Sequence, residues 1–313
     1  MNIVFMGTPD FAATILRALA EAGHNIKAVY TQPDKPQKRS SELIASPVKE
    51  YALTKGFTVR QPDRIRNADE IEVLKSFDAD VFVVAAYGQI LSQEILDIPK
   101  FCPVNVHGSL LPKYRGASPI QRAIADGEEV TGVTIMRMDK GVDTGDMIAK
   151  VAVPITDNDD EDTMYARLAD EGSKLLIEVL KTIEAGTVSF TPQDESEATY
   201  APMIKKEDGL IDFTRSAREI DCKVRGFKKW PTAFTYVGGK MLKIFETKVV
   251  SDIPDADTAD FEPGCFVITK KKIYVTTGDG FIELVSVQPE GKKRMPGMDY
   301  QRGAHIENGM SIG

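Results

Sequence analysis

The sequence predicts an α/β protein: a mostly parallel, doubly wound, Rossmann-like sheet in the N-terminal part, followed by a smaller β-barrel domain. Strand-like apolar runs alternate with amphipathic helix-like segments through the first half of the chain, as is typical of a parallel sheet. Beyond about residue 190 the pattern changes to short β-like runs separated by glycine-containing turns. A length of 313 residues suits two domains.

The expected N-terminal elements follow one another from the first residues. Asn2–Met6 is an apolar run that stops at Gly7, and Asp10–Ala22 carries apolar residues at helical spacing. Ser46–Lys55 opens with a Ser-Pro start signal for a helix. Further strands are expected at Asn25–Thr31, Phe57–Arg60, Val81–Ala86 and Pro103–Val106. We expect ligands to bind outside the carboxyl ends of these strands.

The C-terminal strands are expected to be shorter and punctuated by turns such as Gly238-Gly239. The runs that predict them are Ala233–Val237, Leu242–Phe245, Cys265–Thr269, Lys272–Thr276 and Phe281–Val287. We therefore divide the chain into a first domain over residues 1–190, a polar linker over 191–206 and a small, OB-like β-barrel over 207–313.

Composition excludes several classes of protein. No apolar run approaches the ~20 residues of a membrane span, and the N-terminus lacks the features of a signal peptide, so we expect a cytoplasmic protein with no membrane partner. Three widely separated cysteines, Cys102, Cys222 and Cys265, fit a reducing compartment and exclude a disulfide framework or a cysteine-built zinc site. We interpret Cys102 as a core residue.

The net charge of -8 is unevenly distributed along the chain. Residues 151–200 carry -9, and Asp157–Asp162 stand at the head of an amphipathic segment; acids suit the positive end of a helix dipole, so we expect a capped surface helix and no metal. Cys222–Val250 carries +6, and Lys35, Lys38 and Arg39 lie in a proline-rich stretch. Each basic region is a candidate for phosphate contact or a solvated face.

The common nucleotide and hydrolase motifs are missing. Gly7-Thr8-Pro9-Asp10 stands where a dinucleotide fingerprint would begin, but it lacks the second and third glycines. No Walker loop, nucleophile elbow or HExxH zinc pattern is present. These absences disfavour nicotinamide binding and the most frequent kinase and hydrolase mechanisms.

Two polar side chains share one face of an expected strand. Because side chains alternate along a strand, Asn105 and His107 project together, while Val104 and Val106 face the opposite side. A lone histidine is often structural, but its position beside Asn105 at a strand end favours a functional role.

A second polar loop, Asp139–Asp146, follows the apolar run Val133–Met138. A solvated hairpin is one interpretation of this loop. If the loop instead folds back over His107, one of its carboxylates can orient the imidazole.

These motifs resemble the signature of the folate-dependent formyltransferases. Asn105-x-His107-x-Ser109-Leu110-Leu111-Pro112 is followed by Asp143, thirty-six residues after His107. Further runs resemble the methionyl-tRNA formyltransferase family within that superfamily, along essentially the whole chain: Gly7–Phe11, Thr31–Asp34, Gly116–Arg122, Gly132–Met136 and Asp143–Asp146.

The resemblance implies transfer of the formyl group of 10-formyltetrahydrofolate to the amino group of methionyl initiator tRNA, without a metal. It implies that Asn105, His107 and Asp143 are catalytic: the Asn105 amide and a His107 N–H would donate to the developing oxyanion, and Asp143 would relay a proton. The implied folate-binding residues are Ser109, Leu110, Leu111, Pro112, Tyr87, Gly88, Gln89, Ile90, Leu91, Gly141 and Val142. The expected tRNA-binding residues are Lys35, Lys38, Arg39, Lys205, Lys206, Lys228 and Lys229. We expect a monomer.

Other functions stay open on the sequence alone. A folate-dependent formyltransferase acting on an amino-sugar nucleotide or another small amine would share the three catalytic residues but lack the tRNA-facing parts. A hydrolase that releases formate from the same folate would need no amine. The chain could also be a non-catalytic nucleotide- or RNA-binding module, or its C-terminal domain could be a protein-docking barrel.

Overall fold

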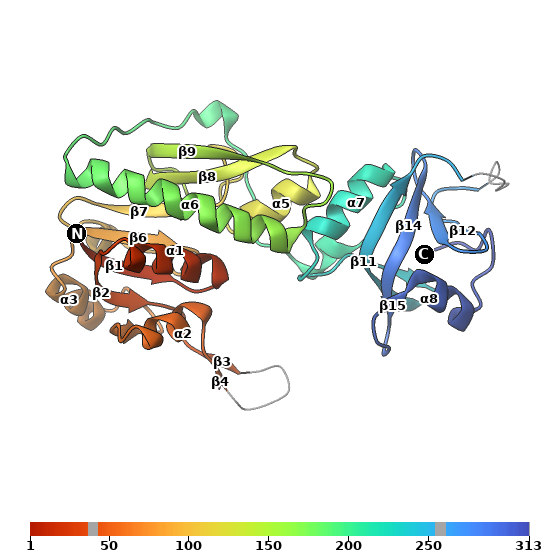
Figure 1. Cartoon of the computed structure of the whole chain (residues 1–313), viewed down its shortest axis with the longest axis horizontal. Helices are drawn as coiled ribbons and strands as arrows, with labels where there is room; N and C mark the ends of the chain where they lie inside the picture. Colours follow the sequence, from red (N-terminus) through yellow and green to blue (C-terminus); the bar gives the residue numbers. More distant parts are fainter. Residues whose placement is uncertain (37–42, 254–260, 313) are drawn as a thin grey trace. The chain divides into compact units, whose positions relative to one another are not determined.

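The computed structural model describes residues 1–36, 43–253 and 261–312, and its contacts divide the chain into two compact units (Figure 1). The first unit contains Met1–Pro119, Val130–Pro154 and Thr163–Ala201. The second unit contains Ile120–Glu129, Ile155–Asp162 and Pro202–Gly313. The segment expected to be a linker over 191–206 is therefore divided between the two units.

The first unit is built on a seven-stranded sheet in the order β5-β2-β1-β6-β7-β8-β9. The first five strands are parallel, whereas β8 and β9 are added antiparallel. This arrangement confirms the predicted mostly parallel sheet; β9 was not among the expected strands. The bounds are β1 Asn2–Gly7, β2 Asn25–Tyr30, β5 Val59–Arg60, β6 Val81–Ala85, β7 Cys102–His107, β8 Val130–Arg137 and β9 Met147–Pro154.

Helices cover both faces of this sheet. Figure 1 shows α1 and α6 in front of the strands, and Ile71 and Leu74 of α3 pack with Val4 and Val84 in a core cluster of buried residues. The Ser-Pro signal works as predicted, because Ser46 Oγ accepts the Lys49 N–H at 3.1 Å and caps α2. The helices are α1 Asp10–Glu21, α2 Pro47–Thr54, α3 Ala68–Ser76, α4 Gln93–Leu96 and α6 Glu161–Glu184; a short hairpin pairs β3 (Lys35–Pro36) with β4 (Leu43–Ile44).

The second unit contains an antiparallel sheet in the order β10-β11-β14-β13-β12, with β15 paired to β14. Among the described residues its outer strands, β10 and β12, do not pair with each other, so the sheet is an antiparallel half-barrel, which confirms the expected small β-barrel-like domain. The strands are β10 Phe234–Val237, β11 Lys240–Val250, β12 Phe266–Ile268, β13 Ile273–Thr276, β14 Phe281–Pro289 and β15 Met295–Pro296. The helices are α5 Pro119–Ala125, α7 Ala217–Gly226 and α8 Gly297–Ala304, and short 3-10 turns are η1 Glu195–Glu197 and η2 Lys206–Gly209.

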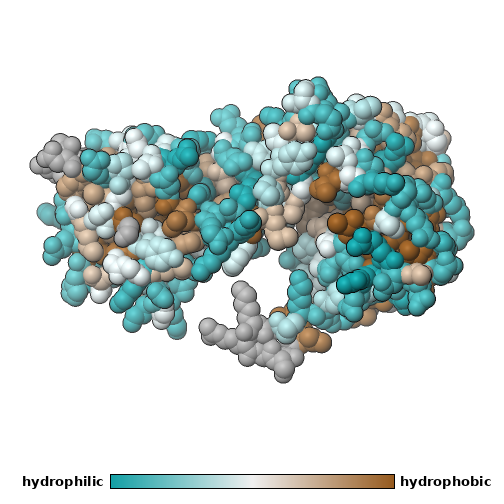
Figure 2. Space-filling view, turned by 180° about the vertical axis from the view of Figure 1, so that it is seen from behind, coloured by the Kyte–Doolittle hydropathy of each residue, from teal (hydrophilic) through white to brown (hydrophobic). Residues whose placement is uncertain are grey.

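The surface is mostly hydrophilic on the face drawn in Figure 2, with apolar patches between the polar side chains. In the part of the chain that the structure describes, no helix is both long and apolar enough to cross a membrane. The apolar residues instead form internal clusters, one of which combines β11, β13 and β14 with α7 in the second unit.

Candidate active site

The carboxyl end of β7 carries the two polar residues predicted to act together. Asn105 is half-buried and His107 is only 5% exposed. Val106, on the opposite face, lies beneath α6, where an added Cβ at Gly172 would come within 3.2 Å of its side chain. Because α6 covers that face, Asn105 and His107 point to the other side of the sheet.

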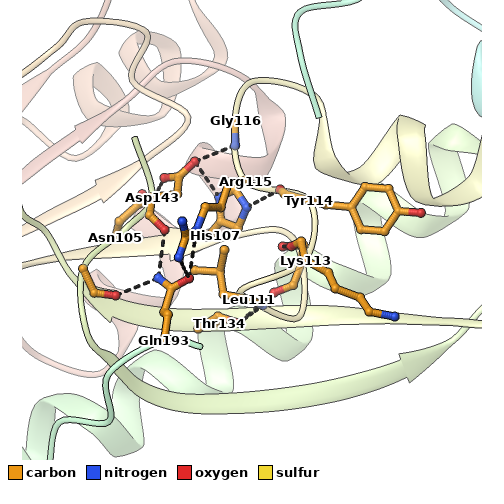
Figure 3. A network of polar contacts seen from close by, with 12 residues as sticks. Asn105, His107, Leu111, Lys113, Tyr114, Arg115, Gly116, Thr134, Asp143 and Gln193 are labelled. Atoms are coloured by element: carbon orange, nitrogen blue, oxygen red, sulfur yellow. Dashed lines mark hydrogen bonds and ion pairs between the residues drawn. The ribbon is translucent and has the colours of Figure 1, made fainter. Parts of the chain in front are cut away.

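His107 contacts protein atoms through both ring nitrogens. Nε2 lies 2.9 Å from the Tyr114 carbonyl oxygen, and Nδ1 lies 3.6 Å from Asp143 Oδ2 (Figure 3). A carbonyl oxygen only accepts, so Nε2 must carry a proton and Nδ1 is the nitrogen presented to the carboxylate. In this structure the Nε2–H donates to the Tyr114 carbonyl oxygen, and donation of a His107 N–H to the oxyanion stays a prediction.

Asp143 is held from several sides. Its Oδ2 accepts the Gly116 N–H at 2.8 Å, and Asn105 Nδ2 lies 3.4 Å from Oδ1. Its backbone has φ of 54°, in the left-handed region, and Tyr114 has φ of 60°. Left-handed backbone at a non-glycine residue costs of order 1–3 kcal/mol, and such strain is concentrated at functional sites. The loop thus folds over His107 and is not a solvated hairpin.

A second group of polar residues forms hydrogen bonds with the main chain of the Asp143 loop. Gln193 Nε2 donates to the carbonyl oxygens of Asp143 at 2.8 Å and Gly145 at 2.7 Å, and Arg115 donates to Gln193 and Glu195. These residues were not predicted from the sequence, because Gln193 and Glu195 lie in the expected linker. Their only sequence signal is the polar character of that stretch.

The expected folate-binding segment Ser109–Pro112 forms a buried turn. Ser109 Oγ donates to the Lys113 carbonyl at 2.6 Å, and the Leu111 N–H donates to Thr134 Oγ1 at 3.1 Å. The Leu111 side chain packs with Met136 and Met147. The Ser109 hydroxyl and the Leu111 N–H are therefore hydrogen-bonded within the protein, and Leu110 is the half-buried residue of the segment.

The second expected folate segment, Tyr87–Leu91, is divided between the core and the surface. Tyr87 is 2% exposed and packs in the core, and burial raises the pKa of its phenol. The Gln89 amide holds the main chain of residues 62–65, at 2.9 Å from both the Ile65 nitrogen and the Pro62 oxygen. In contrast, Ile90 is 70% exposed and Val142 of the Asp143 loop is 62% exposed. Ile90 and Val142 are thus the exposed apolar side chains of the expected folate-binding set; Gly88 and Gly141 are also exposed, and Leu91 is buried.

Among the expected tRNA-binding residues of the first unit, Lys35 alone lies within the described part of the chain. Lys35 is exposed in β3. Lys38 and Arg39 lie outside the described residues. In the second unit Lys205 and Lys206 are exposed at the start of η2.

Two further lysines of the second unit are already paired with acids. Lys228 Nζ lies 2.5 Å from Asp160 Oδ2 and 3.0 Å from Asp162 Oδ2, and Lys229 Nζ lies 2.7 Å from Asp162 Oδ1. The acidic stretch that was expected to open a capped surface helix does lead into α6, and it also neutralises part of the basic region. The described residues contain no group of three His, Cys, Asp or Glu that could hold a metal ion.

Cys102 is interpreted correctly as a residue of the core. It is buried at the start of β7, and burial raises the pKa of its thiol, which disfavours the reactive thiolate.

Comparison with known proteins assigns this arrangement to a family. The chain matches the formyl transferase domain over residues 1–180 and the formyl transferase C-terminal domain over residues 203–305. Methionyl-tRNA formyltransferases of Agathobacter rectalis, Lachnospira eligens and Bacillus subtilis are 49%, 46% and 45% identical to it. The alignments cover 99%, 100% and 100% of this chain and 98%, 100% and 98% of those proteins. The chain belongs to the methionyl-tRNA formyltransferase family.

Solved structures share the formyltransferase fold at much lower sequence identity. An N-formyltransferase from Helicobacter canadensis, in complex with folinic acid and dTDP-3-aminofucose, has a TM-score of 0.69 at 21% identity and covers 92% of this chain and 98% of its own. HypX from Aquifex aeolicus in complex with tetrahydrofolic acid has a TM-score of 0.64 at 18% identity and covers 96% of this chain and 46% of its own. These similarities support the fold assignment.

Proposed function

We propose that this protein transfers the formyl group of 10-formyltetrahydrofolate to the α-amino group of methionyl initiator tRNA. The observation that carries the proposal is the juxtaposition of Asn105, His107 and Asp143 at the carboxyl end of β7. It occurs in a chain that aligns over its whole length with methionyl-tRNA formyltransferases. We further propose that the protein acts as a monomer in the cytoplasm, for which its three unpaired cysteines are suited.

The residue types suit acyl transfer to an amine. The amine attacks the formyl carbon, and negative charge develops on the formyl oxygen. The Asn105 amide can donate to that oxygen, since its 3.4 Å contact with Asp143 is long for a hydrogen bond and is readily exchanged. One oriented donor of this kind is worth ~3–4 kcal/mol in the transition state.

The remaining step is the transfer of a proton from the attacking amine to the folate nitrogen. An α-amino group has a reference pKa near ~8, so roughly a tenth of it is neutral at pH 7, and that fraction can attack without a general base. After attack the amine must lose a proton and the folate nitrogen must gain one. In our proposal Asp143 passes that proton directly or through one water, and His107 Nδ1, 3.6 Å from Asp143 Oδ2, accepts a hydrogen bond from the carboxyl while Asp143 holds the proton.

The folate is proposed to lie against the exposed apolar side chains of the site. Ile90 and Val142 offer that surface, with Gly88 and Gly141 beside them in the chain. The turn Ser109–Pro112 would then shape the floor of the pocket, with Leu110 as its accessible side chain.

The decisive experiment incubates the protein with 10-formyltetrahydrofolate and offers methionyl initiator tRNA, an amino-sugar nucleotide, or water alone. Formylation of the tRNA supports the proposal. Formylation of the sugar alone would favour an amino-sugar formyltransferase, and formate release without an acceptor would favour a hydrolase. Absence of turnover with every acceptor would leave only a binding role and would refute the proposal.

A further inference from the structure

Gln193 has every polar group of its side chain engaged next to the proposed catalytic residues. Its Nε2 donates to two carbonyl oxygens, that of Asp143 at 2.8 Å and that of Gly145 at 2.7 Å. The Gln193 amide nitrogen therefore bridges two carbonyl oxygens of the turn that contains Asp143. It contacts the main chain of Asp143 and leaves the carboxylate to His107 and Gly116 (Figure 3).

Arg115 determines the orientation of the Gln193 side-chain amide. Its guanidinium is 0% exposed and donates to Gln193 Oε1 from Nε at 3.0 Å and from Nη2 at 2.9 Å. It also forms a bidentate pair with Glu195, at 2.9 Å and 2.7 Å. Because arginine can only donate and a carbonyl can only accept, the amide oxygen must face Arg115 and the amide nitrogen must face Asp143.

The same short segment that carries Arg115 also contacts both members of the proposed catalytic pair. The Tyr114 carbonyl oxygen accepts a hydrogen bond from His107 Nε2–H, and the Gly116 N–H donates to Asp143 Oδ2. This segment is held in turn by main-chain hydrogen bonds from Arg115 to Thr199 at 2.9 Å and from Ala201 to Arg115 at 2.7 Å. Residues 193–201 thus form a brace behind the site.

Asp143 needs such a brace because its backbone is strained. A φ of 54° places it in the left-handed region, from which it would relax if the groups around it did not hold it there. Relaxation would turn the carboxylate away from the His107 ring nitrogen. The two hydrogen bonds from Gln193 to the main chain oppose that movement on both sides of Thr144.

We infer that Gln193, oriented by Arg115, is a positioning residue for formyl transfer: it holds the Asp143 main chain so that the carboxylate faces His107. The inference rests on the proposed function. Gln193 itself touches no reacting atom and acts through Asp143.

The test compares Gln193→Glu with Gln193→Met in the full-length protein, using 10-formyltetrahydrofolate and methionyl initiator tRNA. Gln193→Glu keeps the acceptor for Arg115 but removes both donors to the Asp143 loop, and Gln193→Met removes all polar contacts. We expect each to lower kcat by about tenfold to a hundredfold, with KM for both substrates changed less than about threefold, since a misplaced catalytic group slows the chemical step. If Gln193→Met fails to fold, Gln193→Glu carries the test because it still satisfies the buried guanidinium.

A double-mutant cycle separates positioning from general stability. In an Asp143→Asn background, Gln193→Glu should lower the residual rate by less than about twofold, because its effect passes through the missing carboxylate. A control, Gln288→Met, removes a comparable glutamine-to-carbonyl bond of 2.9 Å in the second unit and should leave kcat unchanged.

The outcomes distinguish this inference from the proposed function. A wild-type protein without tRNA formylation would refute the function itself. With an active wild type and an impaired Asp143→Asn variant, wild-type kcat for Gln193→Glu, or an equal loss in both backgrounds, would overturn the positioning role.

Discussion

Asp143 joins a strained backbone to a carboxylate that three groups approach. Asn105, His107 and Gly116 each lie within 3.6 Å of its side-chain oxygens. These contacts fix the orientation of the carboxylate. Asn105 and His107 belong to β7, and Gly116 belongs to a turn. The carboxylate is therefore contacted by residues that lie far from Asp143 in the sequence.

The first prediction concerns the pair His107 and Asp143. His107→Ala and Asp143→Asn should each lower kcat for methionyl-tRNA formylation by about a hundredfold to ten-thousandfold, as expected for a group in proton transfer. Thermal unfolding should show that both variants remain folded. Near wild-type turnover by either variant would remove that residue from the proposed site.

A second prediction concerns Gly116, whose φ is 114° and whose added Cβ would approach the Ala201 carbonyl oxygen at 2.8 Å. Gly116→Ala should displace the N–H that Asp143 accepts, and kcat should fall by about tenfold or more. Gly186→Ala is the matched control: its φ is 67°, but nothing lies within 4 Å of the added Cβ. The control should lose some stability to backbone strain and keep its kcat. Equal kcat values in the two variants would contradict this account.

Two acidic residues at the start of α6 have pKa values that are shifted in opposite directions. Glu161 is buried, and desolvation raises the pKa of its carboxyl although it accepts the Lys229 N–H at 2.9 Å. Asp162 is more exposed, and the ammonium groups of Lys229 and Lys228 lower the pKa of its carboxyl. The neighbouring Gln121 Oε1 is buried without a hydrogen-bond partner among the described atoms.

These opposite pKa shifts predict opposite effects of neutralisation. The raised pKa of Glu161 means that its ionised form destabilises the fold, and this loss develops as the pH rises above the unfolded value near ~4.5. Glu161→Gln should therefore raise the free energy of unfolding at pH 7 by about 1 kcal/mol, and the gain should shrink towards pH 4.5.

Asp162→Asn is the matched comparison for Glu161→Gln. The lowered pKa of Asp162 stabilises the fold above its unfolded pKa, and that contribution is lost as the pH falls through the folded value. At pH 7 this variant should lose up to about 0.5 kcal/mol, because the pair is partly exposed and screened. Thermal unfolding at pH 4.5 and 7 measures both changes. The same sign for both variants at pH 7 would refute this explanation.

The net charge of the complete chain does not indicate whether its partner is a polyanion. The net charge is -8, yet the stretch of 151–200 carries -9 and the Cys222–Val250 region carries +6. In the second unit parts of these two regions pair directly, as Lys228 does with Asp160. Binding of a polyanion would therefore compete with internal ion pairs.

Replacing both Lys228 and Lys229 by Gln tests the proposed tRNA contact. KM for tRNA should rise, and the slope of log KM against log salt should decrease by about 1 for each lysine that no longer neutralises a phosphate. The control pair Lys174→Gln and Lys181→Gln removes two exposed lysines of α6 that also pair with acids, at 2.6 Å and 2.7 Å. Kinetics at several salt concentrations should show no change for the control. An unchanged salt slope in the Lys228 and Lys229 variant would show that these lysines serve only the internal pairs.

Local patterns in the sequence were sufficient for β1, β2, β5, β6 and β7, for α1 and α2, and for the shared face of Asn105 and His107. Helical spacing, the Ser46 cap and strand alternation act over a few residues, so they can be read without the fold. The choice of Asp143 depended on family resemblance, because nothing local shows which carboxylate of its loop would meet the imidazole.

Only the tertiary structure revealed the brace behind the site and the pairing of Lys228 with Asp160. Gln193 lies fifty residues after Asp143, and its meaning depends on the buried Arg115 that orients it. Likewise, the use of both His107 nitrogens depends on a carbonyl placed by the turn at Tyr114. Hydrogen bonds and ion pairs act over a few ångströms in space irrespective of distance along the chain, so their partners are decided by the packed fold.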